Sequence, residues 1–144
     1  MSQRVVEVGY ESPGHADAVT VRREVFIEGQ GVPESLEVDD HEPDCRHFVA
    51  YDGSEPVGAA RLRPLGDGEA KVERVAVVES RREEGWGARL MDAVEDAARK
   101  AGVDTLVLHA QTPVEGFYER RGYRTTSDVF EEAGIPHVEM EREP

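Results

Sequence analysis

The stretch of sequence that decides the fold is VERVAVVESRREEGWGARL, residues 72–90. Its first part, residues 72–78, is rich in valine and predicts a buried strand. An amphipathic helix is predicted next, because apolar residues recur at steps of three and four after Trp86. Gly85 and Gly87 allow close backbone approach, and a helix start presents N–H groups that have no partner inside the helix. The stretch therefore predicts a strand, a phosphate-binding loop and a helix.

The spacing of the loop separates it from other phosphate sites. No Gly-Lys-Ser/Thr follows, as a P-loop requires, and the first glycine of a dinucleotide fingerprint is missing. What stands after the strand is Arg82-x-x-Gly85-x-Gly87. This pattern resembles the acyl-CoA pyrophosphate loop of the GNAT superfamily of N-acetyltransferases, Gln/Arg-x-x-Gly-x-Gly/Ala. The alternative is a helix start whose glycines serve only close packing on a sheet.

Composition narrows the class of protein. The 144 residues are one domain's worth of chain, so we expect a single domain over residues 1–144. The net charge of −14 argues against a nucleic-acid partner, which requires a basic face. No apolar run suits a bilayer and no secretory signal opens the chain, so we expect a cytoplasmic protein without membrane contact. Cys45 is the single cysteine and excludes an internal disulfide.

The acidity also predicts a response to salt. Lys71 and Lys100 are the only lysines, and 31 acidic residues face 17 basic ones. This imbalance repels itself in dilute buffer, whereas at molar salt the screening length falls to about 3 Å. We expect a halophilic protein whose melting temperature rises with KCl concentration. A fall, or no change, toward molar KCl would instead indicate an ordinary acidic protein.

Periodicity along the chain predicts an α+β fold with a mixed, mostly antiparallel sheet and helices on both faces. The strand, helix and strand that begin at Val72, Trp86 and Thr105 form a β-α-β unit with parallel strands. The region 32–45 reads as an irregular acidic loop with a short helical turn. The expected strands cover residues 4–8, 48–51, 56–62, 69–78, 105–110, 123–130 and 137–141, and the expected helices cover 15–27, 86–101 and 112–121.

Further blocks extend the resemblance over nearly the whole chain. The segment from Phe117 to Tyr123 is similar to the closing helix of the GNAT family. Residues 22–33 and 134–137 are similar to its ElaA/YjcF-like branch, although Gly29 stands where that branch usually has Glu. The resemblance implies a GNAT-like acyl-CoA N-acyltransferase fold. It also implies direct acetyl transfer from acetyl-CoA to a primary amine, on a small molecule or a peptide.

The resemblance implies a cofactor site at the loop. Strands holding Val77 and Leu108 should splay apart and admit the pantetheine arm. Arg81, Arg89, Arg120 or Arg121 could meet the outer phosphate, although ordinary surface arginines are the alternative. The acidic loop residues stand where relatives often carry a basic one and would repel pyrophosphate. The implied cofactor-binding residues are Val75, Ala76, Val77, Arg82, Glu83, Glu84, Gly85, Trp86, Gly87, Ala88 and Phe117.

Acetyl transfer requires a base, an oxyanion donor and an acid. Glu73 is the predicted base, because in an unbroken strand it shares a face with Val75 and Val77. The resemblance implies that a bulge in this strand could shift that alternation, and an ion pair with Arg74 or a neighbour is the alternative role for Glu73. The family implies the N–H of Val77 as the oxyanion donor. Tyr118 stands where the family has its general acid, and a packed tyrosine with a satisfied hydroxyl is the alternative.

Several alternatives remain open at this stage. His109 could relay a proton or be structural, and His137 could line the acceptor pocket or fix a turn. His41, Glu42, Asp44, Cys45 and His47 lack a recognised zinc spacing, so no metal is expected. A catalytically silent acyl-CoA-binding regulatory domain would bind acetyl-CoA without turnover. An acyl-homoserine-lactone synthase-like enzyme is a weaker alternative, because the chain is short for it. A homodimer is left open.

Overall fold

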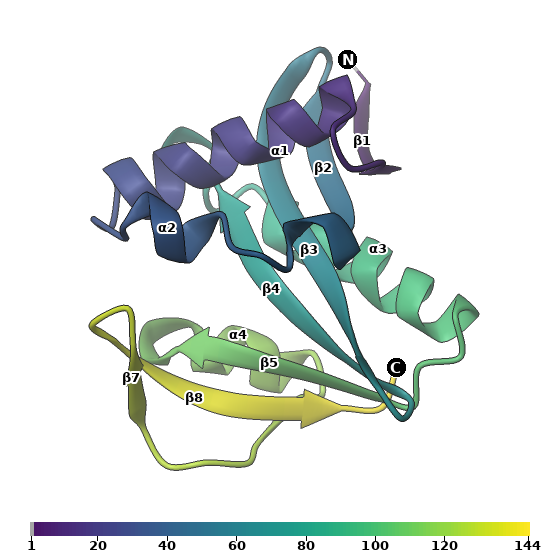
Figure 1. Cartoon of the computed structure of the whole chain (residues 1–144), viewed down its shortest axis with the longest axis vertical. Coiled ribbons are helices and arrows are strands. Elements are labelled where there is room, and N and C mark those ends of the chain that lie inside the picture. Colours follow the sequence, from purple (N-terminus) through teal and green to yellow (C-terminus); the bar gives the residue numbers. More distant parts are fainter. Residues whose placement is uncertain (1) are drawn as a thin grey trace.

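A single mixed sheet of eight strands organises the computed structural model, which describes residues 2–144 (Figure 1). The strand order is β1-β2-β3-β4-β5-β8-β6, and β7 also pairs with β8. Only β4 and β5 run parallel, which confirms the predicted mixed, mostly antiparallel sheet. The strands are β1 Gln3–Val8, β2 Arg46–Asp52, β3 Glu55–Gly66, β4 Glu69–Val77, β5 Thr105–Gln111, β6 Arg124–Thr125, β7 Phe130–Glu132 and β8 Ile135–Arg142.

Helices cover both faces of this sheet, as predicted: α1 and α2 lie on one face and α3 on the other (Figure 1). None of the helices in residues 2–144 is long and apolar enough to cross a membrane. The helices are α1 Pro13–Arg22, which continues as a π-helical segment Arg23–Glu28, then α2 Glu34–Glu37, α3 Trp86–Lys100 and α4 Glu115–Arg120; short 3₁₀ turns cover Glu42–Asp44, Glu79–Arg81 and Thr112–Val114.

The amphipathic pattern after Trp86 produces the main contact between helix and sheet. Trp86, Leu90, Val94 and Ala98 of α3 are all buried. The helix approaches β3 at Gly58, where an added Cβ would lie 2.8 Å from Cδ1 of Leu90. The predicted helix is therefore confirmed, and a glycine in the facing strand allows its close approach.

The strand expected over residues 123–130 is wrong as one element, because the structure divides it into β6 and β7. Between them, the hydroxyl of Ser127 accepts the N–H of Glu139 at 2.9 Å. This side-chain bond takes the place of a backbone ladder bond to β8, and serine competes with regular pairing in this way.

A bulge interrupts β4 at Arg74. Pairing with β3 joins Arg61 to Glu73 and then Ala59 to Ala76, so two steps along β3 match three steps along β4. Arg74 adopts a left-handed conformation with φ 55°, which a bulge residue often needs. The extra residue reverses which face the following side chains point to.

The bulge makes the expected shared face of Glu73, Val75 and Val77 wrong. Val77 lies opposite Gly58 and therefore points to the face covered by α3. Glu73 pairs with a residue three steps from Gly58 along β3, so it points to the opposite face, under α1 and α2. Alternation along an unbroken strand cannot hold across one inserted residue.

Candidate active site

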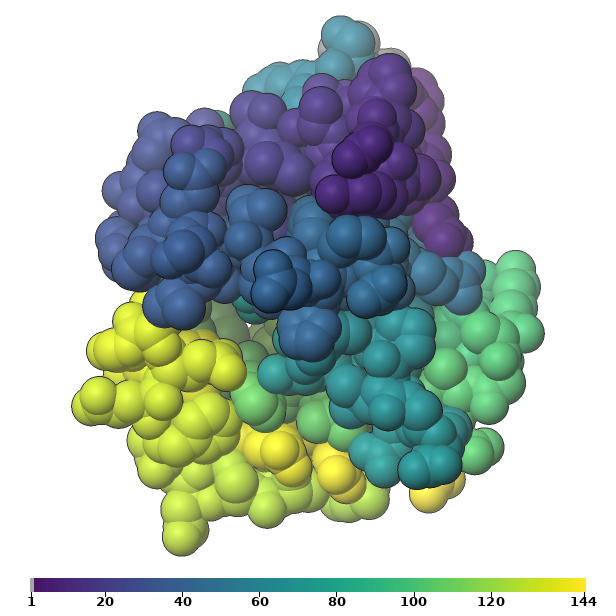
Figure 2. Space-filling model, in the orientation of Figure 1, coloured from purple at the N-terminus to yellow at the C-terminus, as the bar shows by residue number. Residues whose placement is uncertain are grey.

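The sheet opens into a fork between β4 and β5. Their parallel pairing runs from Glu69–Thr105 to Val72–Leu108 and ends there, so the remaining residues of the two strands diverge (Figure 1). Figure 2 shows the surface hollowed beside this fork, between the blue segment that follows α1 and the yellow-green segment near β7. The predicted splay of the two strands is confirmed.

One amide pair joins β5 to the segment that follows the π-helical residues. Nε2 of Gln30, beyond the π-helical segment, donates to Oε1 of Gln111 at 3.3 Å. Nε2 of Gln111, at the end of β5, donates to Oε1 of Gln30 at 3.0 Å. These two hydrogen bonds bridge the opening on the side of the sheet that faces α1 and α2.

The loop before α3 presents a row of free N–H groups. Gly85 is the N-cap, with φ 87°, and no side chain caps the helix. The first bond of the helix runs from the N–H of Arg89 to the carbonyl of Gly85 at 3.2 Å. Within residues 2–144, the six amides of residues 83–88 donate to no protein group. These donors, at the positive end of a 15-residue helix, suit a phosphate anion.

The acidic loop side chain Glu84 is neutralised locally. Its Oε1 accepts Nε of Arg81 at 3.1 Å and Nε1 of Trp86 at 3.1 Å. These hydrogen bonds lower the pKa of Glu84. The ring of Trp86 is buried, so only its backbone N–H remains available to a ligand. The repulsion expected from the loop glutamates is therefore largely reduced to that of Glu83.

The arginines expected to contact the phosphates of the cofactor fall into two groups, those with guanidinium nitrogens left free by the described residues and those held in ion pairs. Nε of Arg82 donates to the carbonyl of Val77 at 3.1 Å, and its terminal nitrogens have no partner in the part of the chain that the structure describes. Arg120 is exposed and also makes no ion pair among those residues. The other two arginines are held in ion pairs within the protein. Arg81 binds Asp52, Glu55 and Glu84. Arg121 binds Asp92 and Glu95.

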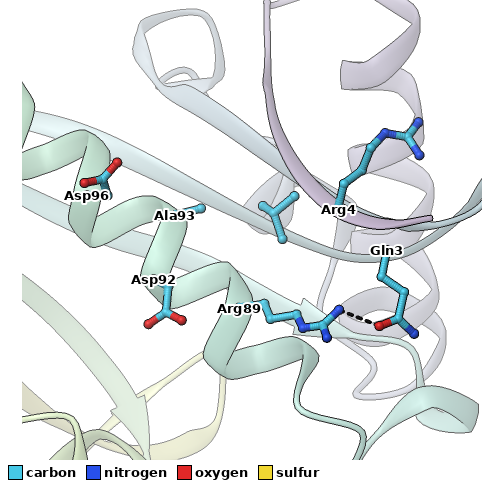
Figure 3. Close-up of a pocket in the computed structure, with 7 residues that line it drawn as sticks. Gln3, Arg4, Arg89, Asp92, Ala93 and Asp96 are labelled. Atoms are coloured by element: carbon cyan, nitrogen blue, oxygen red, sulfur yellow. Dashed lines mark hydrogen bonds between the residues drawn. The ribbon is translucent and has the colours of Figure 1, made fainter.

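Arg89 belongs to a separate depression between β1 and α3. It donates to Oε1 of Gln3 at 2.7 Å (Figure 3). Neither β4, β5 nor the loop contributes to this depression, so it is not an extension of the fork. Its lining residues are Gln3, Arg4, Val5, Arg89, Asp92, Ala93 and Asp96.

Tyr118 of α4 is buried close to the loop. Its ring packs edge-on against Phe117 at 5.0 Å and Tyr123 at 5.7 Å. Phe117 reaches Gly87, where an added Cβ would lie 3.6 Å from its Cζ. Burial raises the pKa of Tyr118 to about 12, and its hydroxyl bonds to no group of the described chain. Tyr118 therefore keeps its proton at neutral pH, as tyrosines ordinarily do, and its hydroxyl lacks the partner that the alternative of a satisfied, packed tyrosine requires.

Glu73 is held by three cations. Its Oε1 lies 2.9 Å from Nη2 of Arg61 and 3.2 Å from Nε of Arg63, and its Oε2 lies 3.3 Å from Nζ of Lys71. Burial alone would raise its pKa, but the charges of Arg61, Lys71 and Arg63 outweigh burial and lower it. A carboxylate with a lowered pKa is a weaker base. The role of Glu73 as the base stays a prediction.

Glu73 belongs to a buried ionic network that sequence analysis missed. Arg61, with 0% exposure, also binds Asp39 at 2.9 Å and Glu42 at 2.7 Å. Arg22 binds Glu42 at 2.6 Å. The pKa of Glu42 falls to about 2, because hydrogen bonds from arginine outweigh burial. One signal was available: an arginine inside an apolar strand, which requires a buried carboxylate partner.

Three buried groups within residues 2–144 resemble a metal site in spacing: His15, Glu42 and His47. Nε2 of His15 lies 2.7 Å from Oε2 of Glu42. Nδ1 of His15 accepts the N–H of Glu11 at 3.1 Å, so the imidazole proton sits on Nε2. A metal-binding nitrogen must carry no proton, so this tautomer favours a hydrogen-bond chain. Burial raises the pKa of Cys45 to about 11, which disfavours a thiolate ligand.

His137 helps to fix the turn before β8. Its Nδ1 lies 2.7 Å from the carbonyl oxygen of Ile135, so Nδ1 carries the proton and donates it. Its ring stacks on Phe130 at 6.1 Å. The predicted structural alternative for His137 is therefore present, and its Nε2 still points toward Glu132 at 3.7 Å.

The forked sheet and the loop define an acyl-CoA N-acyltransferase fold. The family described as acetyltransferase (GNAT) domain matches residues 8–144, and the chain belongs to this family. It is 46% identical over 125 residues to the uncharacterized N-acetyltransferase YjcF of Bacillus subtilis, covering 86% of this chain and 89% of that relative. It is 33% identical over 127 residues to protein ElaA of Escherichia coli, covering 85% and 83%.

Solved structures agree with this assignment. The crystal structure of Escherichia coli ElaA has a TM-score of 0.85 at 26% identity over 99% of this chain and 100% of that one. An acyl-CoA N-acyltransferase from Pseudomonas aeruginosa has the same TM-score and identity over 98% and 99%. A GNAT acetyltransferase from Elizabethkingia anophelis, solved with acetyl-CoA bound, shares the fold at a TM-score of 0.76 and 18% identity over 99% and 98%. The predicted ElaA/YjcF-like branch is confirmed.

Proposed function

We propose that the protein is an N-acetyltransferase that moves an acetyl group from acetyl-CoA to a primary amine by direct transfer. The observation that carries this proposal is the row of six unpaired amides at residues 83–88, set beside the open fork. The donors, the positive helix end and the terminal nitrogens of Arg82 would hold a diphosphate. The relative from Elizabethkingia anophelis, with acetyl-CoA bound, supports this choice of acyl donor.

The fork supplies the remaining part of the cosubstrate site. Beyond Val72, β4 is unpaired on the side of β5, so an extended pantetheine arm would add to this edge as a strand does. Val75, Ala76 and Val77 would contribute backbone groups to it, and the N–H of Val77 would face the thioester oxygen. Phe117 would cover the arm near Gly87.

Tyr118 would complete the reaction by donating its hydroxyl proton to the departing thiolate. Its pKa of about 12 keeps this proton in place up to alkaline pH. The unpartnered hydroxyl also favours an enzyme over a silent acyl-CoA-binding domain, since binding alone needs no buried acid. Acetyl-CoA binding without acetylation across a panel of primary amines would support the silent domain.

Replacing Gly87 by Asp tests the loop. An aspartate in the first turn of α3 is favourable for the helix, whereas its charge beside the amides opposes a diphosphate. We expect acetyl-CoA binding, measured by calorimetric titration, to weaken at least about tenfold without a fall in melting temperature. Gly87→Ala is the matched control, because the methyl group has room beside Phe117 at 3.6 Å and adds no charge.

Titration of the unmodified protein with acetyl-CoA is the first test of the proposed function. If it does not bind acetyl-CoA, the proposed function is wrong. If Gly87→Asp binds as tightly as Gly87→Ala does, the diphosphate does not contact this loop.

A further inference from the structure

His109 lies at the closed end of the fork. It is the first residue of β5 beyond the last pair with β4, Val72–Leu108. Glu73 follows that pair on β4, so His109 and Glu73 point to the same face of the sheet, the one covered by α1 and α2. The His109 side chain is 21% exposed, so a molecule that binds on this face can reach it.

The contacts of His109 define its tautomer. Nδ1 lies 3.0 Å from Oε1 of Glu132, and an ionised carboxylate only accepts hydrogen bonds. Nδ1 therefore carries the proton, and the lone pair of the neutral imidazole is on Nε2. Nε2 faces Oε2 of Glu139 at 3.5 Å, too far for a good hydrogen bond. Phe130 packs edge-on against the ring at 5.0 Å.

Glu132 is held in its ionised form. The hydrogen bond from His109 is the largest of the effects that lower its pKa to about 2; burial opposes it, and Lys71 and His137 reinforce it. Glu139 is also fixed, because its Oε1 accepts the hydroxyl of Thr126 at 3.2 Å. Two carboxylates thus border one imidazole on this face of β5.

We propose that His109 is the base that deprotonates the amine acceptor, that Glu139 holds the incoming ammonium, and that Glu132 is a positioning residue for the imidazole. This inference rests on the proposed acetyltransferase function. It also names the substrate class: a primary amine that arrives as a cation and contacts both Nε2 of His109 and Oε2 of Glu139, which lie 3.5 Å apart.

The proton balance is complete. Nε2 of His109 takes one proton from the ammonium, and the imidazolium is stabilised by Glu132. The neutral nitrogen forms a bond to the acyl carbon, and the carbon–sulfur bond breaks. Tyr118 gives its proton to the sulfur and regains one from the nitrogen, which loses its second proton as the amide forms. His109 then releases its proton to solvent, so one proton is produced per turnover.

Glu73 is less suited to this step. Three cations bind its carboxylate, whereas Nε2 of His109 makes no hydrogen bond to any group in residues 2–144. The charged groups that face His109 are Glu132 of β7, Glu139 and His137 of β8, and Lys71 and Glu73 on the neighbouring strand β4. The two nearest of these groups are the carboxylates of Glu132 and Glu139.

Replacement of His109 by Gln is the direct test. A panel that includes spermidine, glucosamine and a lysine peptide first identifies an amine acetylated by the unmodified protein. With that amine, His109→Gln should lower kcat/KM at pH 7 about 100-fold and abolish the acidic limb of its pH profile. Acetyl-CoA affinity should be unchanged. Exposed His41 provides the matched control, since His41→Gln should leave rate and profile unchanged.

Replacement of Glu132 by Gln tests whether Glu132 positions the imidazole of His109 for catalysis or only stabilises the fold. The amide can still accept the hydrogen bond from Nδ1, but it no longer stabilises the imidazolium. The acidic limb should therefore move to lower pH, a shift that a merely structural residue would not cause. Melting temperatures of all variants check that they fold.

The outcomes distinguish the two proposals. If acetyl-CoA does not bind, or no amine is acetylated, the proposed function and this inference are both overturned. If the unmodified protein acetylates an amine and His109→Gln matches His41→Gln in rate and pH profile, only the inference is overturned. Loss of the acidic limb in Glu73→Gln, but not in His109→Gln, would likewise overturn it and assign the base to Glu73.

Discussion

Replacement of Arg61 by methionine is expected to destabilise the protein by about 3–5 kcal/mol, the usual cost of removing one partner from a buried ion pair. Methionine fills much of the same volume, so the loss comes from charge. Arg61 is fully buried, and its removal takes one cation away from Glu42 and one from Glu73, although Arg22 still pairs with Glu42 and Arg63 with Glu73. The loss is measured by urea denaturation of the variant and the unmodified protein, with the same m-value used for both.

Arg63 provides the matched control for this experiment. It stands two residues further along β3 and meets the same carboxylate, Glu73, at 3.2 Å, but its side chain is partly exposed. Arg63→Met should therefore cost less than about 1 kcal/mol. Adding Glu42→Gln to Arg61→Met should recover part of the loss, because it removes one negative charge from a network that has lost a cation, while Arg22 keeps its pair with Glu37. A small loss in Arg61→Met would show that water or a rearranged cation compensates the carboxylates.

Replacement of Tyr118 by phenylalanine is expected to slow acetyl transfer about 100-fold, while acetyl-CoA affinity stays near normal. The reason is that phenylalanine retains the ring contacts with Phe117 and Tyr123 but has no proton to donate. Single-turnover rates with saturating acetyl-CoA measure the chemical step, and titration measures the affinity separately.

Tyr123 is the natural control for that prediction. It is equally buried, but its hydroxyl donates to Oε2 of Glu95 at 2.9 Å. Tyr123→Phe should thus cost about 1 kcal/mol of stability and leave the rate unchanged. An unchanged rate in Tyr118→Phe would remove Tyr118 from the mechanism, and a slow step in both variants would point to packing.

Secondary structure is predicted best where the apolar residues follow one clear helical or strand periodicity. The apolar repeat after Trp86 predicts α3 to within one residue of its end, because burial against a sheet enforces the period. The mixed sheet follows from the β-α-β order, and the fork was implied by the resemblance to the GNAT family that begins at the loop from Arg82 to Gly87. The roles of individual residues at the site stay predictions.

What the sequence did not predict depends on contacts between distant residues. The periodicity gives no signal of the bulge at Arg74, because it needs no special residue type, and only the family resemblance pointed to one in this strand. Glu132 becomes a partner of His109 only because β7 folds back beside β8. Likewise, the acidic segment read as an irregular loop supplies Glu42 to the buried arginines, a pairing that local patterns do not encode.

The paired glutamines, Gln30 and Gln111, affect how an acceptor reaches the hollow. Their two neutral, solvent-accessible side-chain amides hydrogen-bond to each other. Each such bond contributes only about 0.5–1.5 kcal/mol, since water replaces it on opening. Both bonds can therefore break without disturbing the backbone pairing of the sheet. Separating the two side chains to admit a bulky amine costs little free energy.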